Sequence, residues 1–326
     1  MNVRLNHAVN RLYCGREMRI GLDTAQHQLL WPELVERVQF AESAGFDGAW
    51  VFDHFKPLYG DPDGPCLEAW TLLAGLAAIT SRIRLGVLVT GITYRRPSIL
   101  ATEAITVDHI SNGRLEIGMG AAWHQPEHEE LGVPFPPLKE RAERLEEGVQ
   151  VMRLLMTKDR ATFAGRHYQL ADASYHPRPI QRPHPPIWIG ASGEQLMLPI
   201  AARQADAWHA FGSDDSLARK SRLLDQLAEK AGRDPKAILH SASLSLSRPW
   251  DGAAPSRSAA RGGFRLPDRG VAVGRQAPPR RVRRQGHARA DELALFGLFA
   301  TDVVGPLAQD LGVEFRIGCA GGRCRR

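Results

Sequence analysis

Residues 19–55 read RIGLDTAQHQLLWPELVERVQFAESAGFDGAWVFDHF and contain one complete strand–helix–strand unit. The first four residues form a short apolar run that is typical of a strand. Pro32–Ala44 follows with apolar residues at helical spacing, and Gly45 can adopt the left-handed conformation that ends a helix. Gly48–Phe52 is a second buried strand. Because parallel sheets are built from this repeat, the stretch predicts an α/β fold.

The same alternation continues along the chain. We expect further strands at 83–90, 115–119, 187–190, 207–210 and 238–246, and further helices at 68–80, 99–109, 138–156, 194–204 and 217–231. Seven strands of this kind predict a (β/α)8 TIM barrel. The alternative is a doubly wound Rossmann sheet, which needs a glycine-rich turn after its first strand. Residues 23–26 read DTAQ, so the barrel is favoured.

Composition divides the chain into an N-terminal extension (1–17), a barrel (18–247) with a hairpin insertion at about 161–182, and a C-terminal segment (248–326). This last segment is rich in Arg, Gly, Pro and Ala, and only a helix over Asp291–Glu314 and a strand over Val313–Gly318 are expected in it. Two interpretations stay open: an Arg-rich linker, or a segment read in a shifted frame of GC-rich DNA.

The distribution of charge argues against a nucleic-acid partner. Residues 251–326 hold 14 Arg, no Lys and 7 acidic residues, whereas the rest of the chain holds 28 basic and 29 acidic residues. The near-neutral body is typical of an enzyme that acts on small molecules. No run of apolar residues is long enough for a membrane span. Four scattered cysteines indicate a reducing cytoplasm, and we expect no disulfide or metal site.

In a barrel, chemistry takes place at the carboxyl ends of the strands. Asp53 and His54 follow the second strand, where an imidazole can hydrogen-bond a heterocycle or move a proton near neutral pH. The third strand is apolar enough to form a wall behind a flat ring, and the two arginines that follow it, Arg95 and Arg96, are expected to face solvent. After the fourth strand, the small residues Gly120 and Ala121 allow close approach of a ligand. Trp123 would then form an apolar lid.

The fifth strand leads through Ser192, Gly193 and Glu194 directly into a predicted helix. Small residues at a helix N-terminus form an anion site, so these three residues are candidates for binding a phosphate. An ordinary turn in which Ser192 caps the helix is the alternative.

Taken together, the chain from Met18 to about Leu246 resembles the luciferase-like monooxygenase superfamily, particularly its coenzyme F420-dependent oxidoreductases. The resemblance rests on FDHF (52–55), LEAW (67–70), TSRIRLG (80–86), GRL (113–115), GVPFP (132–136), GRHY (165–168) and the residues Phe163, Ala205, Asp206 and Trp208.

The resemblance implies that a cofactor ring lies in the barrel mouth, with the third strand behind it. It places a bulge there, often with a non-proline cis peptide, at Leu88–Val89 before Thr90. It also assigns the active-site histidine to His54 and the phosphate contact to Ser192, Gly193 and Glu194. Trp123 stands where sugar-phosphate dehydrogenases of this superfamily carry a catalytic glutamate.

The sequence therefore predicts an oxidoreductase that transfers hydride between coenzyme F420 and a small organic substrate. The alternatives are an FMN-dependent monooxygenase and a catalytically impaired cofactor-binding barrel. We expect a cytoplasmic protein, with a homodimer and a cofactor-supplying reductase as candidate partners. His54 is the predicted catalytic residue. The predicted cofactor-binding residues are Asp53, Leu88, Val89, Thr90, Gly120, Ala121, Trp123, Ser192, Gly193 and Glu194.

Overall fold

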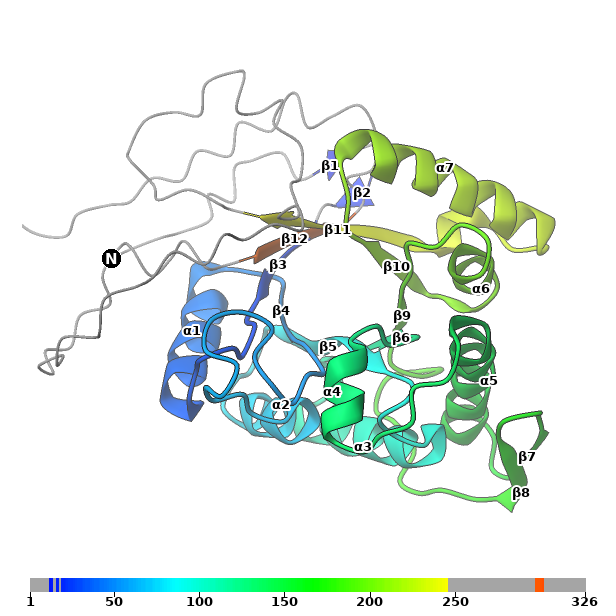
Figure 1. Cartoon of the computed structure of the whole chain (residues 1–326), viewed down its shortest axis with the longest axis horizontal. Coiled ribbons are helices and arrows are strands. Elements are labelled where there is room, and N and C mark those ends of the chain that lie inside the picture. Colours follow the sequence, from blue (N-terminus) through cyan, green and yellow to red (C-terminus); the bar gives the residue numbers. More distant parts are fainter. Residues whose placement is uncertain (1–11, 14–15, 18, 246–296, 302–326) are drawn as a thin grey trace, which may run out of the picture.

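The computed structural model describes residues 12–13, 16–17, 19–245 and 297–301. Within them, eight strands close a barrel in the order β10-β11-β12-β3-β4-β5-β6-β9, surrounded by helices (Figure 1). The barrel strands are β3 (Ile20–Asp23), β4 (Gly48–Val51), β5 (Arg84–Gly91), β6 (Leu115–Gly120), β9 (Ile187–Gly190), β10 (Ala207–Ala210), β11 (Leu239–Ser245) and β12 (Gly297–Thr301). All of them except β12 pair in parallel, which confirms the predicted TIM-barrel fold.

The helices that cover the barrel follow local sequence signals. Glu68 caps one of them by accepting hydrogen bonds from the backbone N–H groups of Trp70 and Thr71. Another ends at Gly45, whose φ of 91° is the left-handed conformation that glycine adopts without strain. These outer helices are α1 (Trp31–Ala44), α2 (Ala69–Ala78), α3 (Pro97–Ile110), α5 (Leu138–Thr157), α6 (Met197–Gln204) and α7 (Asp214–Lys230).

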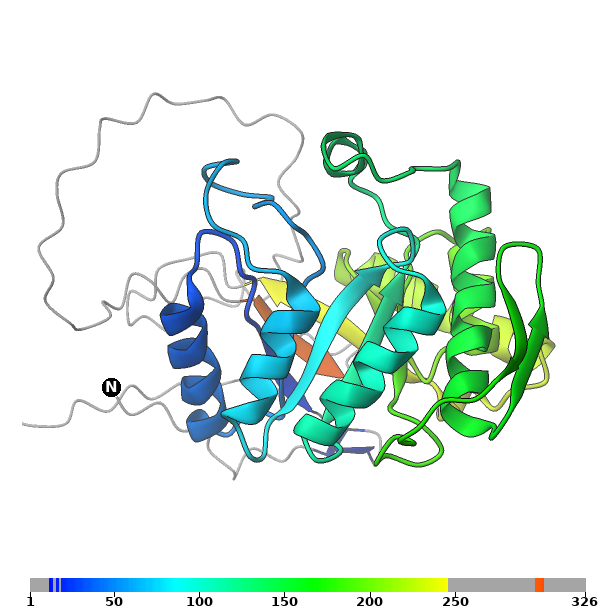
Figure 2. The ribbon, with the colours of Figure 1, turned by 90° about the horizontal axis from the view of Figure 1, so that it is seen from below.

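A short helix, α4 (Gln125–Glu130), was not predicted. It has only six residues and is mostly charged, so it lacks the apolar periodicity that reveals longer helices. Figure 2 shows it projecting from the end of the barrel toward which the parallel strands point, as does the segment between β4 and α2. This end forms the barrel mouth, where the parallel strands deliver their last residues.

The barrel is closed by β12, which pairs antiparallel with both β11 and β3. The prediction of a helix over Asp291–Glu314 is therefore wrong at Gly297–Thr301. The reason is that a short continuous apolar run fits a buried strand as well as a buried helix. The predicted strand at Val313–Gly318 lies outside the described residues.

Side chains fill the barrel interior separately from the outer core between sheet and helices. Trp50 of β4 and Trp188 of β9 meet across the interior, with ring centroids 5.7 Å apart. Trp50 also needs the glycines of its neighbours: a Cβ atom on Gly21 of β3 would lie 1.9 Å from its ring. Side chains and close backbone packing therefore fill the interior around these two rings.

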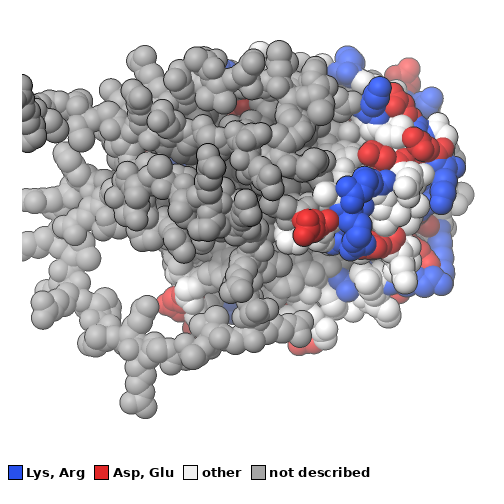
Figure 3. Space-filling model, turned by 90° about the horizontal axis from the view of Figure 1, so that it is seen from above, with Lys and Arg blue, Asp and Glu red and all other residues white. Residues whose placement is uncertain are grey.

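Most predicted elements begin and end within about three residues of the observed ones. The predicted insertion forms the antiparallel hairpin of β7 (Ala161–Ala164) and β8 (Gln169–Ala173). In the 1–17 segment, β1 (Leu12–Tyr13) pairs with β2 (Arg16–Glu17). In the part of the chain that the structure describes, no helix is long and apolar enough to cross a membrane. Acidic and basic side chains lie intermingled on the described surface seen in Figure 3.

Candidate active site at the barrel mouth

His54, three residues beyond the end of β4, lies at the mouth and is held by a carboxylate. Its Nδ1 atom is 2.9 Å from Oε2 of Glu127 on α4, and its side chain is 12% exposed. Because a carboxylate accepts and does not donate, this contact places a proton on Nδ1. The Nε2 atom is then the ring nitrogen with a lone pair when the imidazole is neutral.

Glu127 is itself held by several donors. One carboxylate oxygen accepts the backbone N–H groups of Phe55 (2.6 Å) and Lys56 (3.0 Å), and the other accepts from the Tyr94 hydroxyl as well as from His54. Burial alone would favour the neutral acid, but these hydrogen bonds lower the pKa of Glu127 to about 2. The side chain is 1% exposed and remains ionised at neutral pH.

Tyr94 and His128 extend this network away from His54. The Tyr94 ring stacks on His128, with centroids 4.5 Å apart. His128 Nδ1 lies 2.8 Å from the carbonyl oxygen of His124 and therefore carries a proton, so Nε2 accepts from the Thr93 hydroxyl at 2.7 Å. Burial and the Glu127 carboxylate raise the pKa of Tyr94, which keeps the hydroxyl protonated as a donor.

Asp53, the neighbour of His54, is buried in an ion-pair network. Its Oδ2 atom lies 2.7 Å from Arg95, which also pairs with Glu68 and Glu103. The prediction that Arg95 faces solvent is therefore wrong: its side chain is only 12% exposed because it neutralises buried carboxylates. Arg96 is exposed, as expected. Burial outweighs the Arg95 contact and raises the pKa of Asp53 to about 6, and its Oδ1 atom has no partner among the described residues.

The irregularity expected at the end of the third predicted strand is found in β5. The peptide Leu88–Val89 is cis, which confirms that expectation, and the pairing with β6 shifts register between Val87 and Thr90. Leu88 and Val89 are half-buried. Thr90, by contrast, is fully buried, and its hydroxyl accepts a hydrogen bond from the Trp70 indole at 3.0 Å. Thr90 therefore contacts α2 through its side chain.

Glycines of two neighbouring strands make room for Val89. A Cβ atom on Gly120 of β6 would lie 2.6 Å from a Val89 methyl group, and one on Gly190 of β9 would lie 3.0 Å away. Ala121 follows Gly120 and is buried. Trp123 is 65% exposed, and its ring meets the His54 ring edge-on at 5.7 Å. Of the predicted residues of β5 and β6, Val89 packs against Gly120, and Trp123 contacts His54.

Ser192, Gly193 and Glu194 lie on the β9 side of the mouth and differ from the expectation in one respect. Residues 194–196 form a turn, so α6 begins at Met197 and not at Glu194. The residue at the N-cap position is Leu196, whose side chain makes no capping hydrogen bond, so the alternative in which Ser192 caps the helix is wrong. Ser192 and Gly193 are exposed, and Glu194 pairs with Arg219 of α7 at 2.7 Å.

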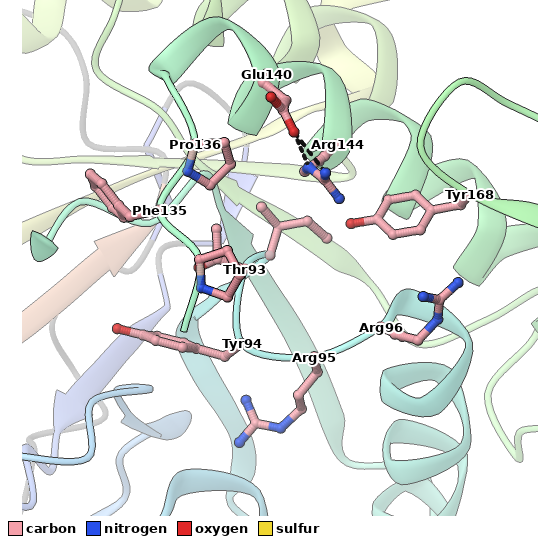
Figure 4. A pocket seen from close by; sticks show the side chains of 11 residues that line it. Thr93, Tyr94, Arg95, Arg96, Phe135, Pro136, Glu140, Arg144 and Tyr168 are labelled. Atoms are coloured by element: carbon pink, nitrogen blue, oxygen red, sulfur yellow. Dashed lines mark hydrogen bonds and ion pairs between the residues drawn. The ribbon is translucent and has the colours of Figure 1, made fainter. Parts of the chain in front are cut away.

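A cavity of about 480 Å³ lies beside the hydrogen-bond network of His54, Glu127 and Tyr94, and Tyr94 belongs to both (Figure 4). In the view of Figure 4, Tyr94 and Phe135 lie on one side, and Arg96 and Tyr168 lie on the other. Glu140 accepts two hydrogen bonds from Arg144, at 2.6 and 2.9 Å, so the charge of this arginine is already paired. The cavity is lined by Ile92, Thr93, Tyr94, Arg95, Arg96, Pro134, Phe135, Pro136, Glu140, Arg144 and Tyr168.

Several residues of the network were missed from the sequence, above all Glu127, Tyr94 and His128. One signal could have found two of them. His124, Glu127 and His128 recur at spacings of three and four, which places them on one face of a helical turn.

Comparison with known proteins places the chain in context. The sequence model described as luciferase-like monooxygenase matches residues 18–305, and so runs past Leu246, where the resemblance noted from the sequence ended. An F420-dependent glucose-6-phosphate dehydrogenase from Kineococcus radiotolerans is 34% identical over 239 residues, which are 72% of this chain and 69% of that one.

Two solved structures of enzymes named as F420-dependent are also similar to this chain. An F420-dependent secondary alcohol dehydrogenase in complex with an F420–acetone adduct has a TM-score of 0.64 and 25% identity, covering 69% of this chain and 68% of that one. A coenzyme F420-dependent tetrahydromethanopterin reductase from Methanopyrus kandleri has a TM-score of 0.61 and 26% identity, covering 70% and 65%.

Proposed function

The chain belongs to the luciferase-like monooxygenase family, and within that family we propose that it transfers hydride between coenzyme F420 and a small organic substrate. The observation that carries the proposal is His54, held at the barrel mouth by the ionised Glu127. The similarity to enzymes named as F420-dependent supports the choice of cofactor.

The residues at the mouth suit a flat heterocycle. Val89 is held between glycines of β6 and β9, where added Cβ atoms would collide with it, so the wall is apolar and set by small neighbours. Asp53 offers Oδ1, a buried acceptor without a partner among the described residues, which a ring N–H could satisfy. When bound, F420 supplies a carbon centre that accepts or donates hydride.

The role of His54 is to move the proton that accompanies the hydride. Oxidation of an alcohol removes a hydride from carbon and a proton from oxygen, leaving a carbonyl. With Nδ1–H donated to Glu127, the Nε2 lone pair can take the hydroxyl proton, and the ionised Glu127 then stabilises the imidazolium. In the reverse direction the same nitrogen returns the proton to the carbonyl oxygen.

Two neighbouring segments complete the proposal. The exposed Trp123 ring, edge-on to His54, would cover the bound substrate and exclude water from the reacting atoms. The turn of Ser192, Gly193 and Glu194, which follows β9, would meet the cofactor phosphate.

The test is a titration of the full chain with F420 and, separately, with FMN, followed by absorbance changes of the cofactor. We expect saturable binding of F420. The bound, oxidised cofactor is then mixed with a panel of small alcohols, and loss of its absorbance reports hydride transfer. Binding of FMN alone would favour the FMN-dependent alternative, and binding of neither cofactor would overturn the proposal.

A further inference from the structure

Two histidines and a carboxylate meet at the mouth although they are far apart in the sequence. His54 follows β4, whereas His124 and Glu127 belong to the α4 segment. One ligand atom of each residue lies within 4.8 Å of those of the other two. Imidazole nitrogens and carboxylate oxygens are donors that Zn²⁺ prefers in proteins.

The hydrogen bonds show which of these groups is available to a metal ion. Glu127 accepts from Phe55, Lys56, Tyr94 and His54, so both of its oxygens are already used. It is better suited to hold His54 than to bind an ion. Histidine ligands of zinc commonly donate their other ring N–H to such a carboxylate, which orients the ring and makes it a better ligand.

The two imidazoles are the available donors. His54 gives Nδ1–H to Glu127, which leaves Nε2 as a donor for a metal. The Nδ1 atom of His124 is buried and has no hydrogen-bond partner among the described residues. The two ring centroids are 5.8 Å apart, with an angle of 78° between the planes. His128 hydrogen-bonds the His124 carbonyl oxygen at 2.8 Å, which fixes this segment of α4.

We propose that His54 and His124 form a zinc site, in which Glu127 orients His54 and water completes the coordination. Zinc at this site would occupy the His54 lone pair that the proposed proton transfer uses, so the ion would inhibit the enzyme. Binding itself does not depend on the proposed function. Only this consequence for activity rests on it.

The test is calorimetric titration of the full chain with ZnCl₂ in the absence of cofactor. The number of ions bound by His124→Ala is expected to fall by one, and Glu127→Gln is expected to bind that ion about tenfold more weakly or worse. His176→Ala is the matched control, because His176 is exposed on a distant loop. Melting curves of each variant check that it is folded.

Zinc stoichiometry and affinity in His124→Ala equal to those of the wild type would overturn the inference, as would the absence of zinc binding by the wild type. Failure of the proposed function looks different. In that case zinc binds and depends on His124, whereas neither F420 nor FMN binds.

Discussion

The two sides of the barrel mouth are built differently. On the β4–β6 side, His54, Glu127 and Tyr94 are joined by hydrogen bonds to one another. On the β9 side, Ser192 and Gly193 are exposed in a turn that precedes α6, and Glu194 pairs with a half-exposed arginine. Both sides were selected from the sequence as site residues, yet only the first is organised by hydrogen bonds between its side chains.

The difference follows from what each side is proposed to do. Proton transfer needs a donor and an acceptor held in a fixed orientation, and burial strengthens the electrostatic contacts that hold them. A phosphate contact needs accessible N–H groups and tolerates solvent. Substitutions on the organised side should therefore have large effects, and equivalent substitutions on the exposed side should have small ones.

Replacing His54 by alanine is expected to have the largest effect. If His54 moves the proton, the rate of hydride transfer should fall by about 10²–10⁴-fold, the usual contribution of general acid–base catalysis. The measurement is single-turnover loss of cofactor absorbance with the alcohol identified in the panel. His176→Ala should keep the wild-type rate. A rate within a factor of three of wild type in His54→Ala would remove His54 from the mechanism.

Glu127→Gln should change how the free energy of unfolding depends on pH. Since the pKa of Glu127 is lowered from 4.5 to about 2, the folded state favours the ionised form by up to about 3 kcal/mol. This stabilisation is fully present above pH 4.5 and is lost as the pH falls toward 2. The difference in unfolding free energy between wild type and Glu127→Gln, measured with urea, should therefore shrink below about pH 4.5. A difference that stays constant between pH 7 and pH 3 would contradict the prediction.

The same substitution tests Glu127 as a positioning residue. Hydrogen bonds to charged groups contribute about 1.5–3 kcal/mol, so the hydride-transfer rate should fall roughly ten- to hundredfold. The amide also stabilises a protonated His54 less well, so the pH–rate profile should move to lower pH. A purely structural role would lower the rate without moving the profile, and that result would count against positioning.

The seven parallel β-strands were predictable because each carries a short apolar signal between helices of clear periodicity. His54 was predictable because a strand end in a barrel is where chemistry takes place. Glu127 was not, because it contacts His54 across 73 positions in the sequence and no local spacing joins them. Arg95 was misplaced for a similar reason: its carboxylate partners come from three different segments.

The wrong prediction of where α6 begins, on the β9 side, has a different origin. The prediction that α6 begins at Glu194 assumed that Ser192 and Gly193 lead directly into the helix, but the carbonyl oxygen of Gly193 accepts the N–H groups of Met197 and Leu198. These two N–H groups donate to a backbone oxygen and not to a side chain, and the sequence does not show which of the two acceptors is used. The closing strand β12 was mistaken for part of a helix because its apolar run fits both structures.

One glycine on each side of the mouth can be replaced to test how tightly that side is packed. A Cβ atom on Gly120 would lie 2.6 Å from Val89, so Gly120→Ala should lower the unfolding free energy by about 1–3 kcal/mol, as overpacked core substitutions do. The nearest atom to a Cβ on Gly193 is 3.6 Å away, so Gly193→Ala should change stability by less than about 0.5 kcal/mol. Urea unfolding of both variants checks the pair. Equal effects would remove the distinction between the two sides.

A small effect is also expected at Glu194, and the direction of the change in cofactor binding decides what this residue does. Its pair with Arg219 involves half-exposed groups, so Glu194→Gln should cost less than about 1 kcal/mol of stability.

If the turn meets a phosphate, removing the Glu194 carboxylate also removes a like charge and frees Arg219 to approach the anion. F420 should then bind a few-fold more tightly, and the gain should diminish at high salt because the groups are accessible to solvent. A cofactor that instead donates a hydrogen bond to Glu194 would bind more weakly to this variant. Tighter binding therefore supports a phosphate held by Arg219 and the turn, whereas weaker binding supports direct contact with Glu194.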